Sequence, residues 1–392
     1  MPPSFAQSGF QSGIAVRQNA VHLGAPRLQG PGLPEKGYWV SSTQVRPTLS
    51  YAADRWSVDA ALEARLSWDS GRLPAAGASQ SAGGPFVRGR TLEALDMTLD
   101  PVRRGDTEGR LRFERLKVAA SLGFLDVEAG RQPVSLGTSR FLGVLDVLAP
   151  FPPGDLDATY KPGIDALRLR AAAGPEGEAE LIAAASDPWE DSALILRLRS
   201  KVGSVDGELL TGKFRRRLFC GAGWEGDAGP LAIWGEVALF ERRPAGEPVR
   251  TGAREAAFAG VAGADWRVRE NATLGLALYR NDFGARRRWD LVSIGDDAPL
   301  REGWVFLAAR EYAAVTFHAE PHALVHLDAS GLMNPVDGSS LWRPRVTVNL
   351  HDNADMSLYA WFAAGRRPLG PTPRSEFGSM PDGLGLYGRV FF

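Results

Sequence analysis

Arginines that stand two positions apart are the residues of this sequence best suited to binding or guiding a ligand. One leucine separates Arg168 from Arg170, and one separates Arg197 from Arg199. In an extended chain, residues two positions apart point to the same side. Guanidinium groups arranged in this way along a wet surface attract anions. The basic side chains expected to line such a surface are Arg65, Arg110, Arg112, Arg168, Arg170, Arg197, Arg199, Arg215, Arg217, Arg267, Arg343 and Arg345.

Acidic residues occupy equivalent positions of other segments. The acidic side chains expected on the same surface are Glu63, Glu114, Asp126, Glu128 and Asp328. Two interpretations stay open. The arginines could select anionic solutes, or they could pair with acids on neighbouring strands and only keep the wall hydrated.

Motifs for catalysis or metal binding are absent from the sequence. His318, His322 and His326 have the spacing of metal ligands on a helix, but Pro321 interrupts the segment, which is typical of a turn followed by a strand. No Gly-x-Ser-x-Gly turn and no glycine-rich phosphate loop occurs. We therefore expect no enzyme activity, no metal site and no cofactor.

The elements that hold these charged residues alternate in polarity with a period of two. From Val58 to Trp68, every second residue is Val, Ala, Leu or Trp, and most of the others are polar. This period indicates β-strands with one apolar and one polar face. The apolar faces are rich in alanine, which suits lipid contact better than the interlocked core of a sandwich. No stretch of about 18 apolar residues occurs, so transmembrane helices are excluded.

Turn-like joints and longer Pro/Gly-rich joints alternate along the chain, which is typical of a barrel in an outer membrane. We expect an all-β protein, a single transmembrane antiparallel up-and-down β-barrel of about 16–18 strands. The barrel is expected to take up 1–392 as one domain, with a tail at 1–8 and long loops at 70–109 and 135–162. These loops are expected to be extracellular or to constrict a pore.

The last segment resembles the C-terminal recognition strand of outer-membrane proteins. Leu384, Leu386 and Val390 share a face that ends in Phe392, and Tyr387 lies on the other face. The resemblance implies that Tyr387, Val390 and Phe392 carry a signal for the barrel-assembly machinery. It also implies outer-membrane lipids and lipopolysaccharide as surroundings.

A second resemblance covers the Gly-Arg-Gln run at 130–132, the Leu-Asp run at 145–146 and Gly163-Ile164-Asp165-Ala166-Leu167-Arg168. This order is similar to that of porin-like proteins of proteobacteria, including alginate-export-type channels. It implies a channel for small hydrophilic solutes, and it does not carry over a particular substrate.

The loop at 138–162 is too apolar for a freely solvated loop. We expect it to fold into the barrel and narrow the pore, although packing across the outer mouth is the alternative. The residues expected to form this constriction are Phe141, Asp146, Phe151, Asp155, Asp157 and Lys161.

The sequence therefore predicts an outer-membrane porin for passive diffusion of small hydrophilic solutes, with an anion preference suggested by its arginines. The alternative is a structural barrel that holds a partner protein or anchors the envelope. Export would use a signal peptide that is not present in this chain, and association as a homotrimer is left open. The net charge of −1 gives no field that would favour nucleic acid.

Overall fold

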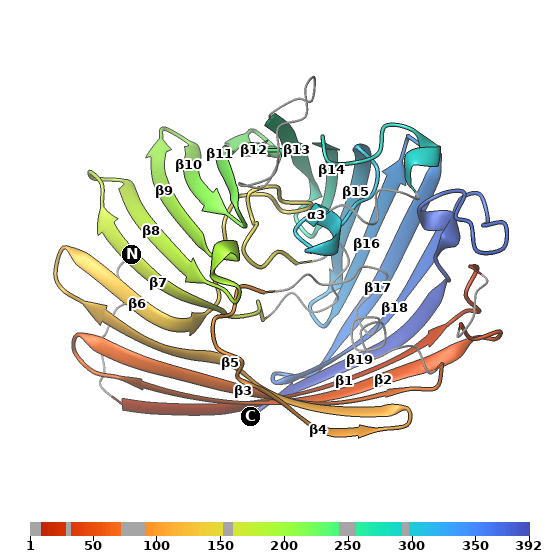
Figure 1. Cartoon of the computed structure of the whole chain (residues 1–392), viewed down its shortest axis with the longest axis horizontal. Helices are drawn as coiled ribbons and strands as arrows, with labels where there is room; N and C mark the ends of the chain where they lie inside the picture. The colour runs from red at the N-terminus through yellow and green to blue at the C-terminus, as the bar shows by residue number, and fades with distance from the viewer. Residues whose placement is uncertain (1–8, 29–32, 72–90, 152–159, 243–255, 292–297) are drawn as a thin grey trace.

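The computed structural model is built almost entirely of antiparallel β-strands (Figure 1). It describes residues 9–28, 33–71, 91–151, 160–242, 256–291 and 298–392. The strands of the ring are β1 (Gly9–Leu23), β2 (Tyr38–Ala52), β3 (Trp56–Asp69), β5 (Thr107–Ser121), β6 (Leu125–Gln132), β7 (Ile164–Ala172), β8 (Gly177–Ala185), β9 (Ala193–Val202), β10 (Val205–Phe214), β11 (Arg217–Ala228), β12 (Leu231–Glu241), β13 (Ala256–Arg269), β14 (Ala272–Asn281), β15 (Glu311–His322), β16 (Val325–Asn334), β17 (Ser339–His351), β18 (Ala354–Ala364) and β19 (Gly383–Phe391).

Pairing between the first and last strands closes the ring. β1 pairs with β19 from Ala15↔Phe391 to Leu23↔Gly383, and β1 also pairs with β2. The other ring strands pair with their neighbours in sequence order. The result is a closed 18-strand up-and-down barrel, which confirms the expected fold class. Closure satisfies the backbone of both terminal strands, as a sheet in lipid requires.

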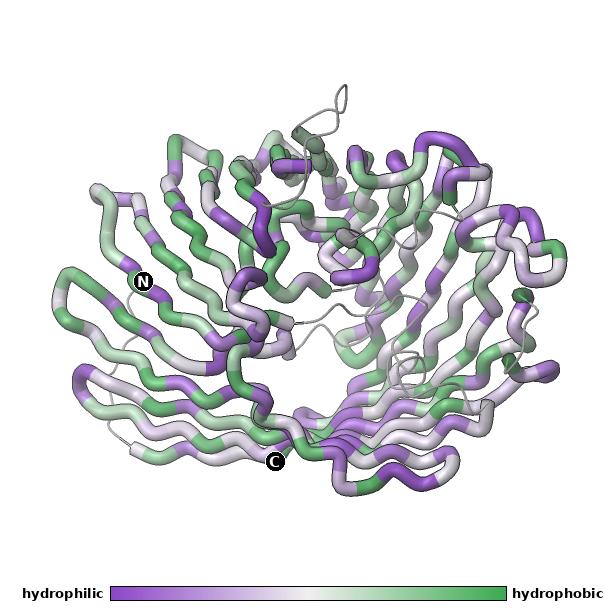
Figure 2. Tube along the Cα trace, in the orientation of Figure 1, coloured by the Kyte–Doolittle hydropathy of each residue, from purple (hydrophilic) through white to green (hydrophobic). Residues whose placement is uncertain are grey.

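Each strand has an apolar outer face and a polar or packed inner face. On β9, Leu194, Leu196 and Leu198 are exposed, whereas Ile195 and Arg197 are buried. Hydrophobic and hydrophilic segments alternate along the strands in Figure 2. Large apolar side chains such as Leu278, which is 70% exposed, point outward around the ring. An apolar surface of this extent is stable in lipid and not in water.

The two ends of the ring differ in their connections. The turn end, which also holds Gly9 and Phe391, joins strands through the short segments 53–55, 122–124, 173–176, 203–204, 229–230, 270–271, 323–324 and 352–353. The loop end carries longer connections, including 133–163, 282–310 and 365–382. Short helices occur in these longer segments or beside them: η1 (Trp189–Asp191), η2 (Arg288–Asp290), α3 (Ala298–Arg301) and η3 (Phe377–Ser379). None of the described helices is long and apolar enough to cross a membrane.

One strand was not expected from the sequence. β4 (Thr98–Arg104) pairs with β5 and was not expected, because Pro101 and its charged neighbours hide the strand pattern. β15 begins at Glu311, and the segment at 303–310 before it packs inside the ring through Val305 and Leu307.

Candidate channel interior

A chain of ion pairs crosses the inner face of the ring from β3 to β10. Lys117 lies 3.6 Å from Asp59 and 3.2 Å from Glu128. Glu128 also pairs with Arg170, and Arg168 connects Glu128 to Glu180. The chain continues through Arg197 to Glu208. We call this set the ion-pair ladder: Asp59, Lys117, Glu128, Arg168, Arg170, Glu180, Arg197 and Glu208.

The ladder is electrically balanced. Its four basic residues face four acidic residues, and each charge has a partner of the opposite sign within the salt-bridge distances above. Arg197, for example, lies 3.5 Å from Glu180 and 2.7 Å from Glu208. The ladder therefore makes the wall polar, and its balanced charges attract neither anions nor cations.

The segment after β6 leaves the wall and crosses the inside of the ring (Figure 1). Glu236 on β12 holds it at the far side. One carboxylate oxygen accepts the backbone N–H groups of Thr138 at 2.7 Å and Ser139 at 2.5 Å. The other oxygen accepts those of Val144 at 2.7 Å and Leu145 at 3.0 Å. Glu236 is only 1% exposed. Its carboxylate satisfies four backbone N–H groups of the loop and so fixes the loop to the wall.

Glycines make room for this anchor. Gly137 has a φ of +89°, and a Cβ there would clash with the Glu236 carboxylate. Gly221 on β11 clears the space that the fully buried Leu145 side chain fills. A side chain at either glycine would push the loop off the wall.

The returning limb of the same loop contacts the opposite part of the wall. Lys161 bonds to both oxygens of Asp146, at 2.6 and 2.5 Å, which ties the two limbs together. Burial lowers the pKa of Lys161, and the Asp146 carboxylate opposes that shift. The Tyr160 ring lies between Arg17 on β1 and Arg46 on β2, at 4.2 and 4.1 Å from their guanidinium carbons. The loop thus spans the interior from β12 to β1 and β2.

A second inserted segment packs against β10 to β12 through aromatic rings. Trp304 lies 5.2 Å from Phe240, 5.3 Å from Phe283 and 5.7 Å from Phe214. Phe219 stacks on Phe240 at 5.6 Å. We call these five rings the aromatic cluster. All five are buried, so side chains fill this part of the interior.

Glu376, in the connection between β18 and β19, joins three segments of the loop end. Its carboxylate accepts bonds from the Ala308 N–H at 2.9 Å, the Tyr312 hydroxyl at 2.5 Å and the Asn334 amide at 2.8 Å. Burial raises the pKa of Glu376 to about 7, against the opposing effect of these donors.

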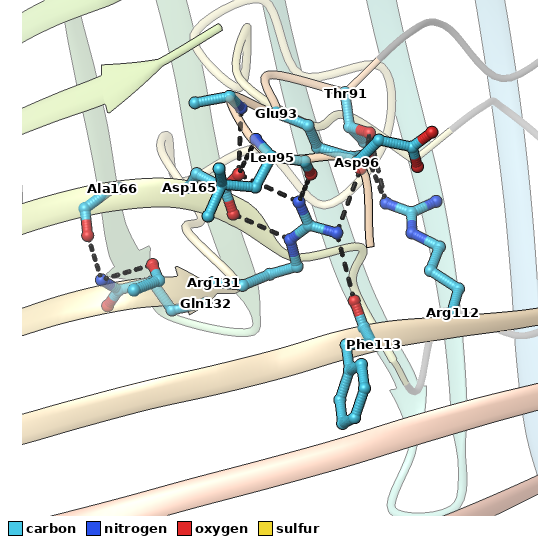
Figure 3. Close-up of polar contacts among 12 residues, drawn as sticks. Thr91, Glu93, Leu95, Asp96, Arg112, Phe113, Arg131, Gln132, Asp165 and Ala166 are labelled. Atoms are coloured by element: carbon cyan, nitrogen blue, oxygen red, sulfur yellow. Dashed lines mark hydrogen bonds and ion pairs between the residues drawn. The ribbon is translucent and has the colours of Figure 1, made fainter. Parts of the chain in front are cut away.

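Arg131 closes a gap in the wall where the constricting loop leaves it (Figure 3). β6 pairs with β5 only from Leu116 onward, and β4 takes the same edge of β5 up to Arg112. Between them, Arg131 bonds to Asp165 at 2.8 Å and to the Phe113 carbonyl at 3.3 Å.

The segment at 91–97 completes this closure. The Asp165 carboxylate accepts the N–H groups of Ala94 at 2.9 Å and Leu95 at 3.0 Å, and Glu93 lies 3.1 Å from Arg131. The Arg131 side chain has no exposed surface, so its charge is neutralised inside the wall. The described part of the loop at 70–109 therefore lies in the wall, and residues 72–90 lie outside the described residues.

Solved structures of low sequence identity share this fold. OccAB4 of Acinetobacter baumannii superposes with a TM-score of 0.57 at 9% identity, over 99% of each chain. OccK11 (OpdR) of Pseudomonas aeruginosa gives 0.56 at 10% identity, over 98% of this chain and 96% of its own. OccD3 (OpdP) of the same species gives 0.56 at 8% identity, over 99% of this chain and 93% of its own. The chain therefore has the barrel fold of these Occ proteins. No family model and no curated protein matches the sequence.

Within this barrel, the predicted basic residues fall into three groups. Arg168, Arg170 and Arg197 belong to the ladder. Others pair locally: Arg65 with Glu63, Arg110 with Asp100, Arg112 with Glu93, and Arg345 with Asp328. The remaining predicted basic residues lie on strands β9, β11, β13 and β17 or in the 215–216 connection: Arg199, Arg215, Arg217, Arg267 and Arg343.

The predicted acidic and loop residues are also placed. Glu114 sits in a bulge of β5, 3.4 Å from Arg46, and Asp126 lies on β6. Phe141 packs partly buried against the hydrophobic core, whereas Phe151 is half-buried at the last described position before a gap. Asp155 and Asp157 lie outside the described residues. On β19, Tyr387 is buried and Phe392 is 75% exposed.

The sequence interpretation missed Arg17, Arg46, Tyr160, Arg131 and Asp165 as interior contacts. Arg17 and Arg46 stand alone on their strands, without a second arginine two positions away. Their importance arises from Tyr160, which is remote in sequence. Asp165 shares a face with Leu167 in the predicted register, and only the pairing of β6 with β7 brings it opposite Arg131.

Proposed function

We propose that the protein is an outer-membrane channel for passive diffusion of small hydrophilic solutes. One observation carries the proposal: a closed 18-strand ring has exposed leucines outside, charged side chains inside and a loop fixed within it by Glu236. Rings of about 16 to 18 strands are wide enough to leave an aqueous path. The exposed outer face would contact outer-membrane lipids and lipopolysaccharide, and the turn end would face the periplasm.

The loop at 133–163 acts as the constriction in this proposal. With its anchor at β12 and its return at β1 and β2, the loop would lie across the path of a solute. Solutes would pass between the loop and the parts of the wall that the loop does not cover. Asp146, Lys161 and Tyr160 would then lie at the narrowest part of the path.

The finer proposal is a preference for anions that depends on Arg17 and Arg46. The ladder is balanced and favours neither sign, so the selectivity has to come from elsewhere. Arg17 and Arg46 flank Tyr160 where the loop returns to the wall. Glu114 offsets part of the charge of Arg46, so the expected preference is modest.

Single-channel recording in planar bilayers tests both parts. We expect stepwise currents from the purified, folded protein and a reversal potential in a salt gradient that favours anions. Arg17→Gln with Arg46→Gln should reduce that preference. Arg103→Gln is the matched control, because Arg103 on β4 has a side chain 68% exposed and lies away from the loop. The absence of ion current from folded barrels would reject the channel and favour a scaffold role.

Assembly adds two further parts to the proposal. The outward apolar face of β19, ending in Phe392, would be the segment recognised by the barrel-assembly machinery. Deleting Phe392 should then slow membrane insertion in a reconstituted assembly assay without changing the channel once folded. The molecular mass of the protein in detergent would show whether copies associate as a trimer.

A further inference from the structure

Three side chains with metal-binding atoms meet at the turn end, across β15 and β16. His318 and Glu320 belong to β15 and His326 belongs to β16. His318 pairs in register with Asp328, which puts His326 two residues nearer the turn on the same face. Glu320 stands two residues after His318 on β15 and therefore lies on this face as well. The spacing of the histidines in the sequence argued against a shared metal site. The pairing of β15 with β16 nevertheless brings the rings of His318 and His326 to 6.3 Å from each other.

The distances between these atoms suit a tetrahedral metal. The Nε2 atom of His318 lies 3.4 Å from Oε1 of Glu320, and Nδ1 of His326 lies 3.3 Å from the same oxygen. Ligands about 2.0–2.1 Å from a tetrahedral zinc ion are separated by about 3.3–3.4 Å. The ligand atoms of all three residues lie within 4.8 Å of one another. Closing the two imidazoles onto one ion requires at most a small ring rotation.

The second nitrogen of His318 is already held as in many zinc proteins. Its Nδ1 atom lies 2.9 Å from Oδ1 of Asp328. This contact keeps the proton on Nδ1 and leaves the Nε2 lone pair directed at the site. The other oxygen of Asp328 bonds to Arg345 at 2.9 Å, which fixes the carboxylate in turn.

The second nitrogen of His326 also has a partner. Its Nε2 atom lies 3.2 Å from the Asn349 side-chain amide on β17. With a metal on Nδ1, the Nε2 atom would carry the proton, and Asn349 would turn its amide so that the oxygen accepts it. Both imidazoles therefore have orienting groups.

Charge and exposure fit a site open to water. Glu320 supplies one negative charge, and the charges of Asp328 and Arg345 offset each other. The side chains of His318, Glu320 and His326 are 47%, 48% and 26% exposed. Three protein ligands in water leave a fourth position for a water molecule or a solute.

We propose that His318, Glu320 and His326 bind a divalent transition-metal ion, with zinc as the ion that best suits two imidazoles and one carboxylate. Asp328 is a positioning residue that acts through His318. The site does not depend on the proposed channel function, because binding is measured on the folded protein whether or not it conducts.

Isothermal titration of the full-length folded protein with zinc tests the site. We expect one zinc ion per chain, with affinity that falls as the pH drops and protons compete for the imidazoles. His318→Ala and His326→Ala should each weaken binding by at least about tenfold. Cobalt in place of zinc should give the intense visible bands of a tetrahedral ion in the wild type and not in these variants.

Two controls separate ligation from general surface binding. His322→Ala removes a nearby histidine whose Nδ1 accepts the Leu324 N–H at 3.2 Å, and it should leave zinc affinity unchanged. Asp328→Asn should weaken binding about tenfold while keeping the 1:1 ratio and the cobalt spectrum. Heat-modifiable migration on gels confirms that every variant is folded. Absence of zinc binding, or binding that His318→Ala and His326→Ala leave unchanged, would overturn the proposal.

Discussion

The wall from β3 to β10 and the wall from β10 to β15 stabilise their inward-facing side chains in different ways. In the first, buried charged groups such as Glu180 satisfy each other through the ion-pair ladder. In the second, aromatic rings of the wall pack against an inserted segment through Trp304. The inner face of the first wall stays polar, whereas the inserted segment covers the inner face of the second.

This difference shows how one barrel can combine a polar path with fixed loops. A loop needs apolar contacts and a backbone anchor to stay inside the ring, and β11 and β12 supply both through Gly221 and Glu236. A solute path needs polar groups that do not hold a loop, and the ladder supplies those. The following experiments test this division of the interior.

Glu236→Ala should have the largest effect. It removes the acceptor of four backbone N–H groups, so the loop at 133–163 loses its anchor. We expect single-channel conductance to rise by roughly twofold or more as the path widens. The free energy of unfolding should fall by about 3–5 kcal/mol in a denaturant titration. Glu208→Gln is the matched control on the ladder, and its conductance should stay near that of the wild type.

Trp304→Ala should produce the next largest effect, and mainly on stability. Trp304 is 8% exposed and contacts three rings of the aromatic cluster. Its loss should lower the free energy of unfolding by about 3 kcal/mol. Trp289→Ala is the control, since Trp289 is 63% exposed and should change stability by less than about 0.5 kcal/mol. Equal losses in both variants would contradict a packed role for the cluster.

Glu376 should make loop-end stability depend on pH. Its pKa is raised to about 7 in the folded protein from an ordinary value of 4.5. The folded state therefore binds the proton more tightly than the unfolded state. The stabilisation that results is complete below about pH 4.5 and is lost as the pH rises through about 7. Because the side chain keeps some exposure, we expect the free energy of unfolding to fall by on the order of 2 kcal/mol over this range of pH. Denaturant titrations at pH 5 and pH 8 measure it.

Glu376→Gln provides the comparison for that measurement. The amide stays neutral at both pH values and still accepts bonds from the surrounding donors. The difference in unfolding free energy between pH 5 and pH 8 should therefore shrink in the variant. An unchanged difference would assign the pH dependence to other groups.

Glu180→Gln should have the smallest effect, and mainly on ion selectivity. It removes one negative charge from a balanced set, so the reversal potential should shift toward anions by a few millivolts while conductance changes little. The Arg168 side chain is 14% exposed, so the loss in unfolding free energy should be only about 1 kcal/mol. Arg197→Gln should shift the reversal potential in the opposite direction. Shifts of the same sign in both variants would show that the ladder does not act as a balanced set.

The sequence alone predicted the barrel and most of its strands. Alternation of residues such as Leu194, Leu196 and Leu198 with Arg197 and Arg199 depends only on the geometry of an extended chain, and the structure has the same two faces. The closed ring then follows, because strands with an apolar face in lipid cannot leave an open edge. β4 escaped prediction because a short, charged strand containing Pro101 lacks that alternation.

The interior contacts depended on the tertiary structure. Glu236 contacts Thr138 from 98 positions away, and Arg17 reaches Tyr160 only because β1 closes the ring. Register between strands decides which charges pair and whether His318 meets His326. A sequence pattern states the side of the strand on which a residue lies. Strand pairing and the path of the inserted loops decide what that residue contacts, because those contacts join residues that are distant in the chain.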